Sequence, residues 1–110
     1  MNTTKRAIIL GTLSRRAKNE QAELYWRIEK KDLSKLSYQS QRAAALGSAL
    51  QLIQTNPAGA EEATRDSLHA AEAALDKLKL AGADGFREIS AAAGLAAGWA
   101  VAVHIWEVSK

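Results

Sequence analysis

The stretch SAAAGLAAGWAVAVHIW, residues 90–106, decides the expected fold, because all but two of its residues are apolar or glycine. Placed on a helical wheel, it has a bulky side that includes Trp99 and Trp106. The opposite side carries Gly94 and Gly98, which leave room for the backbone of a second helix. Each glycine costs about 1 kcal/mol of helix propensity relative to alanine, which a close helix contact would offset.

A helix with two such sides needs partners on both of them. We therefore expect an all-α fold, an antiparallel bundle of about four helices in which this C-terminal helix is the most buried. The residues expected to pack it, within the chain or across a dimer, are Ser90, Gly94, Gly98, Trp99 and Trp106.

Two other interpretations of this stretch fit its residues less well. A membrane span needs about 20 strongly apolar residues, whereas this run is shorter, rich in Ala and Gly, interrupted by His104 and closed by Glu107. A helix-turn-helix would use residues 96–106 as its recognition helix, and these contain no Arg, Lys, Asn or Gln to contact base edges. We expect neither a membrane span nor this mode of DNA binding.

Composition sets the broad class. The chain has 110 residues, of which 47% are hydrophobic and 25% charged, which is typical of one globular domain, residues 1–110. It contains no cysteine, so disulfides and thiolate chemistry are excluded. Near the N-terminus a brief apolar run is followed by charged residues, unlike a signal peptide, and we expect a cytoplasmic protein. A single proline and 23 alanines favour long helices.

Charge is divided unevenly along the chain. Through Thr55 there are ten Lys or Arg against four acidic residues, a net +6, and from Asn56 there are five against eight, a net −3. The basic half could bind nucleic acid or an acidic protein. Alternatively, the two halves attract each other within the monomer or across a head-to-tail dimer.

The first helix is expected from Thr3 or Thr4 to about Lys30. Its outer side alternates basic residues with Ile8 and Trp26, a pattern that suits an acidic protein partner with an apolar anchor, or a phosphate backbone with a stacked base. Alternatively, this face has no binding function: the bundle covers the helix on two sides, and its cationic side chains simply reach past the apolar surface into solvent. The expected inward residues are Ile9, Leu13, Ala17, Leu24 and Ile28. The candidate partner-binding residues are Lys5, Ile8, Arg15, Arg16, Lys18, Trp26, Arg27, Lys30 and Lys31.

The boundary with the second helix is open, because Asp32 or Ser34 could cap a new helix or lie within a continuous one. If the two helices fuse into one rod, the chain would have to dimerise. The second helix also offers small residues, Ser40 and Gly47, for close approach to the last helix. Its expected core stripe is Leu36, Ala43, Leu46, Leu50 and Ile53.

The third helix is expected to start at a turn in which Asn56 is the N-cap and Pro57 the first helical residue. It is expected to run to about Leu80 and stop at Gly82, with Asp84 capping the final helix. Its inward residues are expected to be Leu68, Ala71, Leu75 and Leu78.

No pattern of catalytic residues emerges. Glu62, Asp66 and His69 share a face of the third helix, but that face lies opposite its apolar residues, and the His104-x-x-Glu107 pair reverses the order that di-iron bundles use. No glycine-rich phosphate loop and no nucleophile with an adjacent base occur. We expect no enzyme activity, metal or cofactor.

The sequence thus predicts a non-enzymatic protein-interaction module that forms a homodimer and uses the basic and aromatic outer face of its first helix. Its small size and alanine-rich composition resemble adaptors, regulators or inhibitors of larger bacterial or phage machines, an association from composition alone. The alternative is a nucleic-acid-binding protein that uses the same basic face.

Overall fold

The structure, a computed structural model, describes residues 3–30, 36–82 and 86–109, with Phe86 described by its backbone only. Four helices account for nearly all of these residues: α1 (Thr3–Glu29), α2 (Leu36–Thr55), α3 (Ala60–Leu80) and α4 (Phe86–Val108). The described residues contain no strand. The predicted all-α bundle of four helices is confirmed, and α1 and α2 are two separate helices that pack against each other.

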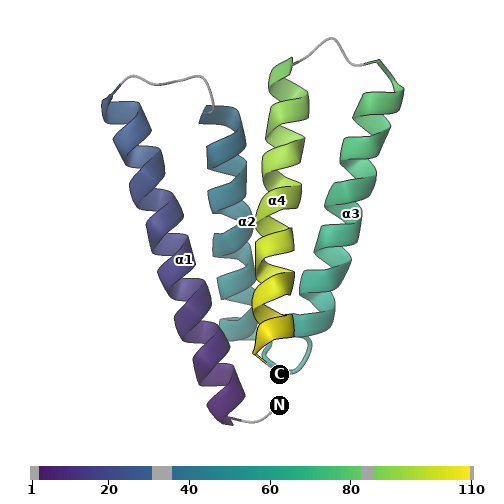
Figure 1. The fold of residues 1–110 in the computed structure, drawn as a ribbon. Coiled ribbons are helices and arrows are strands. Elements are labelled where there is room, and N and C mark those ends of the chain that lie inside the picture. The colour runs from purple at the N-terminus through teal and green to yellow at the C-terminus, as the bar shows by residue number, and fades with distance from the viewer. Residues whose placement is uncertain (1–2, 31–35, 83–85, 110) are drawn as a thin grey trace.

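The helices lie side by side in the order α1, α2, α4, α3, and successive helices alternate in direction (Figure 1). Because of this alternation, α2 and α4 run parallel to each other in the middle of the molecule. The outer helices α1 and α3 do not pack against each other in the described parts of the chain. The bundle is accordingly flattened, with overall dimensions of 46 × 34 × 21 Å.

The contact between α2 and α4 is unusually close, and two glycines make it possible. A Cβ atom added to Gly94 would collide with the backbone oxygen of Tyr38. One added to Gly98 would lie 2.6 Å from the backbone oxygen of Arg42 and 2.7 Å from Cβ of Ala45. The predicted pairing of these two helices is confirmed, and the groove at the glycines receives a helix of the same chain.

The side of α2 that makes this contact is not the predicted one. Gly47 is exposed, and a Cβ atom added there would meet nothing within 4 Å. Ser40 and Gly47 instead line the groove between α1 and α2. The small residues that α2 presents to α4 include Ala45, which is buried. The prediction selected the correct pair of helices but the wrong face of α2, because several faces of α2 carry small residues.

The core lies around α4, which contacts all three other helices. Its buried residues come from both the bulky side and the glycine side, so the expectation that it is the most buried helix is confirmed. The buried apolar residues of the fold are Ile9, Leu13, Ala45, Leu46, Ala49, Ile53, Ala60, Ala71, Ala96, Trp99, Ala102, Val103, Ile105 and Trp106.

The turn before α3 is where it was predicted, but the helix begins three residues later than expected. Asn56 to Gly59 form the turn, with the Gly59 N–H donating to the Asn56 backbone oxygen at 3.2 Å, and Gly59 occupies the N-cap position without a side-chain cap. Pro57 is therefore a turn residue. At the other end the prediction is confirmed, because Gly82, which follows the C-cap residue Ala81, adopts a φ of 62°. The proposed caps Asp32, Ser34 and Asp84 lie outside the described residues.

Arg65 joins α3 to the end of α4. Its guanidinium donates to Glu61 on the same helix at 3.1 Å and to Glu107 on α4 at 3.2 Å. The hydrogen bond to Glu61, and then that to Glu107, raises the pKa of Arg65 above its already high usual value, so the guanidinium stays charged at any ordinary pH.

Residues 87–108 of α4 form a helix long and apolar enough to cross a membrane, judged by length and composition alone. About 39% of the 18-residue window that meets this test is buried inside the molecule. A core helix passes the same test, so the expectation that the chain has no membrane span stays a prediction.

The glycine contact can be tested with alanine substitutions in matched positions. We expect Gly94→Ala to lower the free energy of unfolding by about 1–3 kcal/mol, because overpacking outweighs the gain in helix propensity. Gly47→Ala, where the added methyl meets open space, should raise it by about 0.5–1 kcal/mol. Denaturant titration of both variants measures the difference. Stabilisation by Gly94→Ala would show that α2 and α4 do not approach as closely as described.

Candidate functional site

The strongest candidate site is the outer side of α1, which no other helix covers. Tyr25 is 61% exposed, and Ile8 and Trp26 are each 53% exposed, large values for such apolar side chains. Between them Arg15 and Lys18 are exposed and form no ion pair with any described residue. We call these five residues, Ile8, Arg15, Lys18, Tyr25 and Trp26, the α1 outer face.

A shallow depression lies on the N-terminal half of this face. Its lining is entirely from α1 and includes Ala7, Ile8, Gly11 and Arg15. Gly11 is exposed, and a Cβ atom added to it would meet nothing within 4 Å. Unlike Gly94, Gly11 weakens its helix without allowing a contact inside the molecule. The depression is therefore free to accept a side chain of another molecule.

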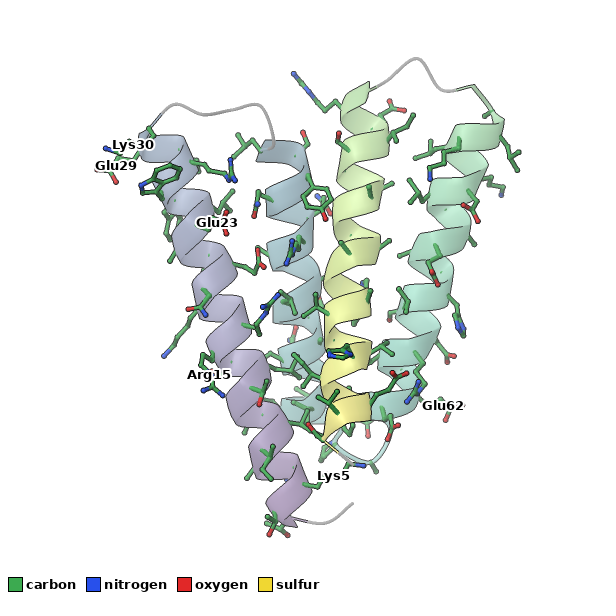
Figure 2. All side chains as sticks on the ribbon, in the orientation of Figure 1. Lys5, Arg15, Glu23, Glu29, Lys30 and Glu62 are labelled. Atoms are coloured by element: carbon green, nitrogen blue, oxygen red, sulfur yellow. The ribbon has the colours of Figure 1, made fainter. Side chains whose placement is uncertain are left out.

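The predicted partner-binding residues divide into two groups. Ile8, Arg15, Lys18, Trp26 and Lys30 are exposed, as expected. Three others are engaged within the chain: Lys5 lies over the ring of Trp106, 5.9 Å from its centroid, Arg16 lies 3.7 Å from Glu20, and Arg27 donates to Glu23 at 3.2 Å. Lys31 lies outside the described residues. Figure 2 places Arg15 on the outer edge of α1 and Lys30 at its end.

A buried carboxylate fixes the position of α1 against α2. Glu20 is 6% exposed, and its Oε1 lies 3.0 Å from Nε of Arg42 on α2, in addition to the longer contact with Arg16. Glu20 Oε2 and the nearby helix's Gln39 Oε1 are buried and accept no hydrogen bond from the described residues. Because opposite charges offset the cost of burial only when they stay paired, this contact depends on the register between α1 and α2.

A second hollow lies between α1 and α4. It has a volume of about 460 Å³ and is mostly apolar, with Val101, Ile105 and Val108 on the α4 side. Arg16 and His104 stand at its rim as the charged or titratable residues. His104 is exposed beside this hollow. Its place within the apolar run 90–106 did not indicate that it would border a groove.

The residues predicted to pack the last helix lie within the single chain. Trp99 and Trp106 are in the core, Gly94 and Gly98 are in the α2 contact, and Ser90 is half-buried. The contacts found at the two glycines are intramolecular. A homodimer, if it forms, needs another surface.

No metal centre is apparent in the described residues, which contain no group of three or more His, Asp or Glu side chains placed to hold an ion. Glu62, Asp66 and His69 are exposed on α3, as their position opposite its apolar residues predicted. Comparison with known proteins gives no match to a family model, to a curated protein or to a solved structure.

The sequence did not predict two exposed residues near the C-terminal end of α1, of which Tyr25 belongs to the α1 outer face and Ile28 lies beside it in the chain. Ile28 was predicted to face inward, but it is 49% exposed, because α2 does not cover that side of the last turns of α1. Tyr25 is absent from the predicted partner-binding residues, although its place next to Trp26 indicates an aromatic patch. Both enlarge the exposed apolar surface at the C-terminal end of α1.

The role of Glu20 can be separated from that of an exposed glutamate. Glu20→Gln should lower the free energy of unfolding by about 1–3 kcal/mol, because two arginines lose a buried charged partner. Glu23→Gln removes an exposed pair with Arg27 and should cost under about 0.5 kcal/mol. Thermal unfolding of the two variants measures both effects. Equal, small changes would mean that Glu20 does not hold α1 in place.

Tryptophan fluorescence tests the exposure of the site. Of the three tryptophans, Trp99 is 8% and Trp106 2% exposed, so Trp26 should account for nearly all emission that acrylamide quenches. Trp26→Phe should abolish the readily quenched component, whereas Trp99→Phe should leave it. A quenched component that survives Trp26→Phe would contradict this arrangement.

Proposed function

We propose that this protein is a non-enzymatic protein-interaction module, an adaptor, regulator or inhibitor, that docks through the α1 outer face onto an acidic or mixed protein surface. One observation carries the proposal: a single helix face without a helix neighbour combines exposed aromatic and aliphatic side chains with two cations that have no ion pair among the described residues.

The chemistry of this face suits protein binding. Aromatic residues and arginine dominate the energetics of protein interfaces, where truncating one well-buried anchor costs about 2 kcal/mol or more of binding free energy. Trp26 and Tyr25 are adjacent and about half exposed, so a partner could bury both together. The depression at Gly11 would let the partner's atoms approach the backbone of α1 closely.

Nucleic-acid binding through the same basic residues is supported less well. Among the cations assigned to that function, Lys5, Arg16 and Arg27 each contact a side chain of the same molecule. The acidic residues Glu23 and Glu29 are also exposed on this helix, where they would repel a uniformly anionic phosphate backbone but could pair with the cations of a mixed protein surface. The supply of free cations on the outer side is thus smaller than the sequence suggested.

The proposal is tested with variants that keep the fold. Gly11→Leu should raise or maintain stability, because leucine has the higher helix propensity, while it fills the depression. Trp26→Ala removes the anchor. We expect both variants, used as bait in the native host's lysate, to lose at least one protein that the wild type recovers. The control Lys77→Glu/Lys79→Glu, on exposed residues of α3, should retain it.

The wild type and these variants also test the alternative function, nucleic-acid binding. Anisotropy titrations with duplex and single-stranded oligonucleotides should show no binding at low salt. Binding to duplex DNA whose logarithmic salt dependence has a slope of about −0.9 per phosphate would favour the nucleic-acid function. If Gly11→Leu and Trp26→Ala recover every protein that the wild type does, the α1 outer face is not the docking surface.

A further inference from the structure

The edge of the molecule opposite the α1 outer face is acidic. Glu62, Asp66, Glu72 and Asp76 of α3 are exposed, and none of them forms an ion pair with a described residue. We call these four residues the α3 outer face. Figure 2 shows Arg15 and Glu62 on opposite outer edges of the bundle. The unequal charge of the two halves of the chain is thus not neutralised by contact between α1 and α3, which do not pack together.

Both faces carry like charges at neighbouring positions. Glu62 and Asp66, and likewise Glu72 and Asp76, are four residues apart on α3, a spacing at which like charges repel along a helix. Arg15 and Lys18 are three residues apart on α1. Glu29 on α1 and Lys77 and Lys79 on α3 are also exposed, but none of them forms an ion pair with these residues in the described parts of the chain, so each like-charged pair can still gain a partner from the other face.

We propose that the α3 outer face of one copy binds the α1 outer face of a second copy, so that the protein assembles head to tail. This inference rests on the proposed function, since it names a partner for the same docking surface. The helices α1 and α3 run in the same general direction but diverge toward their C-terminal ends (Figure 1), so a sideways shift of one copy combined with a rotation lays them alongside each other. The cations of α1 then face the carboxylates of α3.

Such a contact leaves one free α1 face and one free α3 face on every pair. A heterologous contact of this kind produces a ring or an open chain of copies rather than a closed two-fold dimer. The two helices share about 30 Å of length and a helix is about 10 Å wide, so each copy buries only a few hundred Å². The assembly is therefore weak, dependent on concentration and sensitive to salt.

Charge reversal tests this geometry in the full-length chain. In sedimentation velocity at low salt, the average mass of the wild type should rise with concentration, and the rise should diminish as salt is added. Arg15→Glu/Lys18→Glu and Glu62→Lys/Asp66→Lys should each weaken association by about tenfold or more. A mixture of these two variants should associate, because an intact basic face meets an intact acidic face. Circular dichroism confirms that each variant is folded.

Control variants separate this inference from general charge effects. Arg87→Glu, on an exposed residue of α4 outside both faces, lowers the net charge half as much as the α1 reversal does, and it should leave association intact. Should Glu62→Lys/Asp66→Lys unfold the protein, Glu72→Lys/Asp76→Lys on the same face replaces it and should have the same effect.

Three results would overturn the head-to-tail assembly. They are a monomeric wild type at every soluble concentration at low salt, association that survives either reversal, and failure of the mixed variants to associate. Association lost only in the α1 variant would indicate contact between two α1 faces. A monomeric wild type whose host partner is still lost on Trp26→Ala would refute the assembly while leaving the proposed function standing.

Discussion

The close contact of α2 with α4 at Gly94 and Gly98 determines the shape of the molecule. In a bundle whose helices alternate in direction, the parallel pair normally lies on a diagonal and is kept apart by side chains in the core. Here the two glycines remove those side chains from α4, and its backbone meets the backbone of α2 at Tyr38 and Arg42. One diagonal of the bundle shortens until the helices touch, and the other lengthens, so α1 and α3 become outer edges.

The position of α1 follows from that geometry. Its N-terminal half is held by Ile9 and Leu13, which are buried in the core, and further along by the ion pair between Glu20 and Arg42. Tyr25 and Trp26 lie on the side of α1 that no other helix covers, and both stay exposed. The surface proposed for docking is therefore a consequence of how the core closes, because the same sequence in a square bundle would bring α1 closer to α3.

The positions of the four helices, and the pair of helices that packs most closely, could be predicted from the sequence. Both depend on patterns within single helices, namely apolar periodicity and the spacing of the glycines. The exposure of a helix face could not be predicted where it depends on the position of a neighbouring helix. Ile28 fits the inward stripe of α1 by spacing, yet it is exposed because no helix reaches it. Glu20 is buried, which is rare for a glutamate. Its burial is possible because Arg16, one turn earlier, and Arg42, on α2, supply positive charge. For the site, exposure of Ile8, Arg15 and Trp26 followed from the wheel, whereas the pairing of Arg16 and Arg27 with nearby acids did not.

The distribution of charge connects the fold to association. If α1 and α3 were neighbours, their opposite charges would be satisfied within one molecule and would give no reason to expect a partner. The α2–α4 contact keeps them apart, on the two edges of a molecule 34 Å across in its middle dimension. The electrostatic attraction between the basic α1 edge and the acidic α3 edge can then act only between molecules. The exposed aromatic residues on the α1 edge add an apolar contribution to binding. The glycines that compact the core are thus the same feature that leaves the two edges available for binding.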